Sequence, residues 1–158
     1  MKPSMKTGFS FGLTSGIITT LGLIVGLNAG THSKTAVIGG ILTIAIADAF
    51  SDALGIHVSQ ESQNTQSDRS IWEATVVTFL AKLVFSLTFI IPVLLLKLDK
   101  AVFASVIWGF SILAIFSFII AKGEKKNPKN VVIEHLVIGL VVIFLTNLLG
   151  NWIAGIFN

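Results

Sequence analysis

The sequence contains no cysteine, and charged side chains make up only 12% of its 158 residues. The absence of cysteine excludes disulfides and thiolate metal sites. Soluble domains carry about 25% charged residues, so this scarcity of charge, with a mean hydropathy of +0.88, excludes an ordinary soluble domain. The Gly-x-Ser-x-Gly, His-Glu-x-x-His and phosphate-loop motifs are also missing, so we do not expect an enzyme.

The few charges lie mainly in short segments between long apolar runs. Residues 101–121 and 136–158 contain no Asp, Glu, Lys or Arg, and about 20 helical residues are enough to cross a bilayer. The pattern predicts an all-α protein with a single transmembrane domain, 1–158, and the lipid bilayer as its surroundings. Five spans are expected, at approximately 9–29, 35–58, 72–96, 101–121 and 132–156.

The basic residues predict the orientation of these spans. With five spans the termini lie on opposite sides of the membrane. One side then carries seven basic residues, which are Lys2, Lys6, Arg69, Lys122, Lys125, Lys126 and Lys129. The other side carries three, which are Lys34, Lys97 and Lys100. The positive-inside rule therefore places the N-terminus in the cytosol and the C-terminus outside, in a multi-pass protein of the cell membrane. Because topology explains the basic loops, no nucleic-acid partner is expected.

Glycine recurs every four residues in the first span, at Gly8, Gly12 and Gly16 and again at Gly22, Gly26 and Gly30. Small residues at this spacing let two helix backbones approach closely. Two interpretations remain open, namely packing within the chain and a homodimer interface that includes Gly12, Gly16, Gly22 and Gly26.

Three ionisable side chains are expected inside the membrane, where each charge costs about 2.5–3.5 kcal/mol on insertion scales. Asp48 and Asp52 are four residues apart and share one helix face. At a rise of 1.5 Å per residue, Asp48 and Lys82 both lie roughly 15 Å from the inner side. An Asp48–Lys82 ion pair is therefore one interpretation, and it would leave Asp52 without a partner.

The alternative interpretation is a transport pathway, because polar side chains from three spans fall in one layer. Ser15 and Thr19 of the first span lie at similar depths to Asp52 and Asp48. His57 lies one turn beyond Asp52 and is a candidate ligand or an interfacial residue. The candidate pathway residues are Asp48, Asp52, Ser15, Thr19 and His57, with no catalytic residue among them.

Two segments of the chain resemble the vacuolar iron transporter family. Residues 15–26, Ser-Gly-Ile-Ile-Thr-Thr-Leu-Gly-Leu-Ile-Val-Gly, are similar to the family's Asp-Gly-Ile-Val-Thr-Thr-Phe-Gly-Val-Val-Ala-Gly. Residues 47–63, Ala-Asp-Ala-Phe-Ser-Asp-Ala-Leu-Gly-Ile-His-Val-Ser-Gln-Glu-Ser-Gln, are similar to its Ala-Asp-Gly-Leu-Ser-Met-Ala-Ala-Gly-Glu-Tyr-Leu-Ser-Val-Lys-Ser-Gln. Weaker matches extend through the later spans.

The resemblance implies a dimer of five-helix protomers that moves Fe²⁺ or Mn²⁺ out of the cytosol in exchange for protons, with no permanently bound cofactor. Ser15 stands where the family has a metal-binding aspartate, and Asp52 where it has a metal-binding methionine. The cytosolic metal-binding domain of many members is replaced by the short loop 59–70. A site of this kind is richer in oxygen ligands than the family's. A transporter of a non-metal solute and a non-transporting membrane scaffold remain the alternatives.

Overall fold

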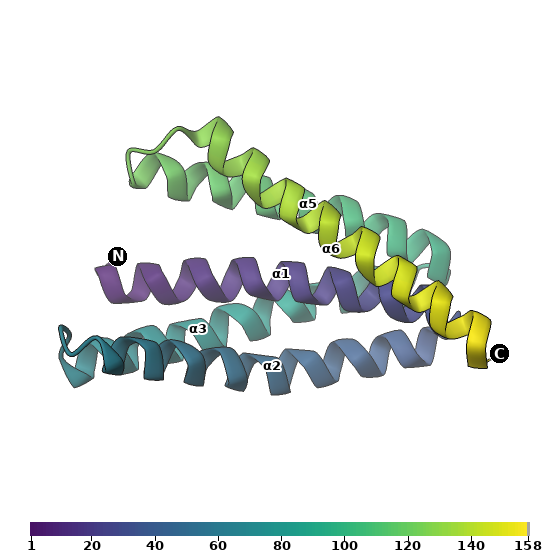
Figure 1. Ribbon diagram of the computed structural model, residues 1–158, viewed down its shortest axis with the longest axis horizontal. Helices are drawn as coiled ribbons and strands as arrows, with labels where there is room; N and C mark the ends of the chain where they lie inside the picture. The colour runs from purple at the N-terminus through teal and green to yellow at the C-terminus, as the bar shows by residue number, and fades with distance from the viewer. Residues whose placement is uncertain (158) are drawn as a thin grey trace. The chain divides into compact units, whose positions relative to one another are not determined.

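The computed structural model describes residues 1–157, and this range is helical except for short turns. The helices are α1 (Pro3–Thr31), α2 (Lys34–Ser62), α3 (Asp68–Thr88), α4 (Ile90–Leu95), α5 (Leu98–Gly123) and α6 (Pro128–Phe157), as labelled in Figure 1 where space allows. Five stretches are long and apolar enough to cross a membrane, with α3 and α4 counted as one. The predicted all-α fold and its five spans are therefore confirmed. Every helical stretch begins before its predicted span, and all but the third, which ends at Leu95, also end beyond it, because the polar end turns are helical too.

Local chemistry accounts for several helix ends. His32, with a φ of 47°, turns the chain between α1 and α2. The backbone N–H of Ala36 donates to Ser33 Oγ at 3.2 Å, which caps the start of α2. Pro128 begins α6, where a residue without an N–H loses no helical hydrogen bond. These short connections keep successive helices close along the chain.

The third span is interrupted at Phe89, between α3 and α4. Pro92 explains this break, because proline has no N–H to donate to the carbonyl four residues earlier, at Thr88, and its ring clashes with that carbonyl. The third span therefore consists of two helices, the long α3 and the six-residue α4.

The helices group into two compact units. The first comprises Met1–Ile17 and Leu42–Thr88, and the second comprises Ile18–Ile41 and the chain from Phe89 onward. The sequence predicts one domain, and it gives no sign of this grouping because the boundaries at residues 17 and 41 fall inside continuous helices. The boundary at Thr88 coincides with the end of α3.

In the first unit, α1 packs directly on α3. A Cβ added to Gly8 or Gly12 would overlap the backbone carbonyl of Ala74 or Thr78, respectively. At Gly16 an added Cβ would lie 3.2 Å from the carbonyl oxygen of Lys82. Each step of four along α1 matches a step of four along α3, so the two helices run parallel in close contact.

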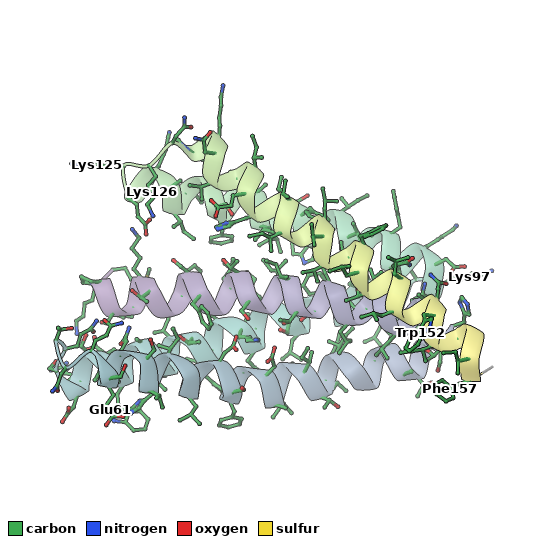
Figure 2. All side chains as sticks on the ribbon, viewed as in Figure 1. Glu61, Lys97, Lys125, Lys126, Trp152 and Phe157 are labelled. Atoms are coloured by element: carbon green, nitrogen blue, oxygen red, sulfur yellow. The ribbon has the colours of Figure 1, made fainter. Side chains whose placement is uncertain are left out.

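In the second unit, the later part of α1 packs on α6 in the same manner. A Cβ on Gly26 would lie 3.4 Å from Thr146, and one on Gly30 would lie 3.4 Å from the carbonyl of Gly150. The α5 and α6 helices contact each other extensively and are joined by a short turn (Figure 1). Lys97, Lys125 and Lys126 lie at or beyond the ends of α5, away from its apolar middle (Figure 2).

The glycine faces of α1 are thus occupied by helices of the same chain. This is the intrachain alternative of the sequence analysis. An intersubunit contact through Gly12, Gly16, Gly22 and Gly26 would require α3 and α6 to leave these faces. A homodimer stays a prediction, and the glycines are not its interface in this structure.

Candidate functional site

The middle of the first unit contains a buried charge cluster centred on Lys82. The Lys82 side chain is 1% exposed, and its ammonium makes ion pairs with the carboxylates of both Asp48 and Asp52. Lys82 Nζ also donates to Ser15 Oγ at 2.8 Å, and the Ser15 hydroxyl donates to Asp52 Oδ2 at 2.6 Å. Three helices, α1, α2 and α3, therefore contribute to one polar cluster.

Helix geometry brings these four side chains together. Asp48 and Asp52 are one turn apart on α2 and present their carboxylates on the same side. The close approach of α1 to α3 at Gly16 lets Ser15 reach the Lys82 ammonium, because Gly16 has no side chain to separate the backbones. Asp48 is the central residue of α2, which places the cluster about 20 Å from either end of that helix.

The structure places Asp48 beside Lys82, as the depth estimate predicts, but it corrects the interpretation of Asp52. The sequence analysis leaves Asp52 without a partner, whereas in the structure Lys82 pairs with Asp52 as well. The depth estimate could not show the Lys82–Asp52 pair, because it compared only how deep each residue lies. A flexible lysine side chain can reach two carboxylates that are one helical turn apart. Two carboxylates and one ammonium leave the cluster with a formal charge of −1.

Access to the cluster is uneven. The Asp48 side chain is 29% exposed and the Asp52 side chain 19% exposed, whereas Lys82 is closed in. The two aspartate side chains are therefore partly accessible, and the ammonium is not.

The remaining predicted site residues are His57 and Thr19. His57 Nδ1 lies 3.0 Å from Thr75 Oγ1, and the imidazole packs edge-on against Trp72. Thr19 lies one turn beyond Ser15 on α1, in the part of the helix that belongs to the second unit. Within residues 1–157, no group of three or more histidine or acidic side chains is arranged to hold a metal ion. The structure brings Asp48, Asp52 and Ser15 together around Lys82, and the roles of Thr19 and His57 stay predictions.

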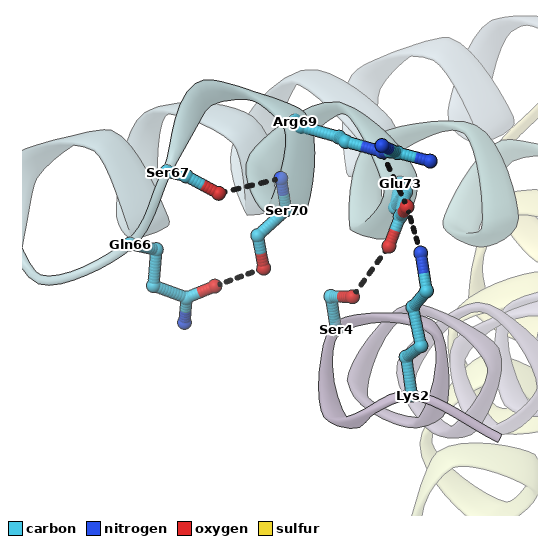
Figure 3. A network of polar contacts seen from close by, with 7 residues as sticks. All are labelled: Lys2, Ser4, Gln66, Ser67, Arg69, Ser70 and Glu73. Atoms are coloured by element: carbon cyan, nitrogen blue, oxygen red, sulfur yellow. Dashed lines mark hydrogen bonds and ion pairs between the residues drawn. The ribbon is translucent and has the colours of Figure 1, made fainter.

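A second polar network joins the beginnings of α1 and α3 (Figure 3). Glu73 accepts from Lys2 at 2.5 Å, from Ser4 at 3.1 Å and from Arg69 at 3.3 Å. The sequence gives no sign of this network, because Lys2 and Glu73 are 71 residues apart along the chain. It ties the start of α1 to the start of α3 and so helps to hold Ser15 opposite Lys82.

The polar side chains of α6 behave differently. Thr146 donates to the carbonyl of Val142 in its own helix at 2.8 Å, and the Asn151 amide donates to the carbonyl of Asn147 at 2.9 Å. Ser117 and His135 form one hydrogen bond between α5 and α6, at 2.7 Å. The described polar contacts of the second unit thus contain no counterpart of the Lys82 cluster.

Comparison with known protein families adds to this picture. No curated protein and no solved structure matches the chain. The sequence model of the VIT family matches residues 9–71, which include Ser15, Asp48 and Asp52. The VIT family consists of iron and manganese transporters and not of enzymes. The chain is therefore a multi-pass membrane protein in which residues 9–71, less than half of its length, match the VIT family.

Proposed function

We propose that the protein exports a divalent metal ion, iron or manganese, from the cytosol across the cell membrane. The observation that carries this proposal is the pair of partly accessible carboxylates, Asp48 and Asp52, at the middle of a membrane-spanning helix inside the VIT-family domain. A charge in the interior of a membrane protein is costly and is typical of an ion pathway.

The chemistry of the cluster supports a hard divalent cation. The carboxylates of Asp48 and Asp52 and the hydroxyl of Ser15 supply only oxygen, which suits hard cations such as Mn²⁺, Mg²⁺ or Ca²⁺ better than soft metals. Of these, Mn²⁺ is also among the metals that the VIT family transports. The formal charge of −1 also attracts a cation, since part of the carboxylate charge is not neutralised by Lys82.

The proposal includes the homodimer that the resemblance implies. The second copy would use a surface other than the glycine faces of α1, because these faces contact α3 and α6 of the same chain. Mass measurement in mild detergent and in nanodiscs tests this part of the proposal, and a purely monomeric protein in both media would contradict it.

The test of transport is metal flux in proteoliposomes, measured with Fe²⁺ and with Mn²⁺. Asp52→Asn keeps the shape of the side chain and removes its charge, while Asp48 remains to neutralise Lys82. Flux should fall about tenfold or more, because an uncharged amide is a poor ligand for a hard cation. Asp99→Asn is the matched control, since Asp99 is exposed in the first turn of α5 and its change should leave flux unaltered.

One observation favours a second candidate, a membrane scaffold that transports nothing. Lys82 contacts both carboxylates and Ser15, and a scaffold would use these contacts only to join α1, α2 and α3. A scaffold predicts no metal flux in the wild-type protein and a loss of folded protein on disruption of the cluster. Full flux in Asp52→Asn would contradict the metal-transport proposal in its present form.

A further inference from the structure

Lys82 occupies the position that a transported cation would need. Its ammonium contacts the carboxylates of Asp48 and Asp52 and the hydroxyl of Ser15, which are the three side chains that remain as metal ligands. Burying a charge is expensive unless it is paired and hydrogen-bonded. The sequence of the chain nevertheless places a lysine here, inside a span, where a neutral side chain would fill the same space.

We propose that Lys82 is a tethered counter-cation, which neutralises part of the site when no metal is bound and so lets the empty transporter change conformation without a second ion. This inference rests on the proposed function and specifies how that function is driven. It makes Lys82 a positioning residue for the empty site, because the metal itself is held by oxygen ligands.

Charge arithmetic gives the physical reason. With Lys82, the empty site carries −1 and the site loaded with a divalent cation carries +1. Without Lys82, the empty site would carry −2 and the loaded site would be neutral. The electrostatic cost of placing a charge in a medium of low dielectric constant rises about as the square of the charge. Lys82 therefore removes the state with the highest electrostatic energy, which is the doubly charged empty site. The empty and the loaded site then each carry a single charge.

The geometry favours this role over a simple structural ion pair. One carboxylate is enough to neutralise one ammonium, yet Lys82 contacts two. The aspartate side chains are partly exposed and the ammonium is closed in, so the carboxylates are more accessible to a second cation than Lys82 is. Ser15 Oγ accepts from Lys82 at 2.8 Å, which gives the ammonium a neutral partner when the carboxylates turn to a metal.

A consequence for energy coupling follows. The resemblance predicts exchange of metal for protons, in which protons neutralise the carboxylates on the return step. Lys82 supplies that positive charge permanently. The wild-type protein should therefore move metal down its concentration gradient without a pH gradient, at a rate that a pH gradient changes less than about twofold.

Two assays on the same proteoliposomes test the inference, both with Mn²⁺. Net flux into metal-free buffer requires the empty transporter to return. Exchange of labelled for unlabelled Mn²⁺ at equal concentrations on both sides requires only the loaded form. Lys82→Met should lose net flux about tenfold or more and keep exchange, because it leaves the empty site at −2. It should also bind Mn²⁺ more tightly.

Two further variants provide matched controls. Lys82→Arg keeps the charge and should retain both net flux and exchange within a few-fold. The double variant Lys82→Met with Asp48→Asn has one carboxylate and no ammonium. Its empty and loaded sites again carry −1 and +1, but it also lacks one metal ligand, which lowers both rates together. The ratio of net flux to exchange should therefore recover relative to Lys82→Met alone.

The outcomes separate the inference from the proposed function. Wild-type protein that shows neither exchange nor net flux with Mn²⁺ or Fe²⁺ overturns the proposed function and the inference with it. Wild-type exchange with net flux of Lys82→Met equal to that of the wild type overturns the inference alone. If Lys82→Met loses exchange and net flux together, and the double variant regains both together, Lys82 is structural and the inference is wrong.

Discussion

Both halves of α1 pack on another helix through glycines spaced four residues apart, but the two contacts differ in polarity. Gly8, Gly12 and Gly16 bring the first half onto α3, and Gly22, Gly26 and Gly30 bring the second half onto α6, each time with a parallel helix. On the first face the partner helix carries Lys82 and its ion pairs. On the second face the hydroxyl of Thr146 donates a hydrogen bond to a carbonyl of its own helix. The same glycine spacing therefore supports a charged cluster in one unit and plain helix contact in the other.

The largest expected effect is a loss of protein stability when the Lys82 cluster, on the α1–α3 side, is disrupted. Lys82→Met leaves two partly buried carboxylates without a cation and should cost about 3 kcal/mol of unfolding free energy. The double variant with Asp48→Asn should recover part of that loss. Reversible unfolding in mixed detergent micelles measures both, and a double variant no more stable than the single one would show that Asp48 and Lys82 are not coupled.

The glycines themselves give the next contrast. Gly12→Ala places a Cβ against the backbone carbonyl of Thr78, which cannot move without its helix, and should cost about 2 kcal/mol. Gly26→Ala meets Thr146 at 3.4 Å, an ordinary contact distance, and should change stability by less than about 0.5 kcal/mol. Thermal unfolding of the two variants side by side is the measurement, and equal losses would remove the proposed difference between the faces.

The smallest contrast concerns two hydroxyls. Ser15→Ala removes a donor to Asp52 and an acceptor for Lys82 and should cost about 1–1.5 kcal/mol. Thr146→Val removes a hydroxyl that bonds only to carbonyls of its own helix, where the loss should be a few tenths of a kcal/mol. The same unfolding assay applies, and a larger loss in Thr146→Val would mean that the second face also depends on polar contacts.

Much of the fold is predictable from the sequence, because charge is confined to the ends of apolar stretches long enough to span a bilayer. The break in the third span is also foreseeable, since Pro92 has a known effect on the preceding turn. The partners of α1 are not, because a glycine spacing shows that a helix approaches closely and does not show which helix. The Gly16–Lys82 contact could not be anticipated for this reason.

The candidate site was predictable only in part. Helical spacing places Asp48 and Asp52 on one face, and depth places Lys82 near Asp48. Depth alone could not show that one lysine would pair with both carboxylates, nor that Ser15 would hydrogen-bond to both Lys82 and Asp52. The position of His57 one turn beyond Asp52 suggested a ligand or an interfacial residue; its imidazole bonds to Thr75, and its role stays a prediction. Rotation about the helix axis decides these contacts, and the sequence of a nearly uniform apolar helix carries little information about rotation.

The break at Phe89 has a consequence for how motion spreads along the third span. In an unbroken helix, opening at one end proceeds residue by residue along a continuous chain of backbone hydrogen bonds. Here Pro92 donates no such bond to Thr88, so opening of α4 stops at the break and leaves α3 intact. Amide hydrogen exchange should therefore change abruptly between Thr88 and Ile90, with slow exchange retained around Lys82 even when α4 opens often.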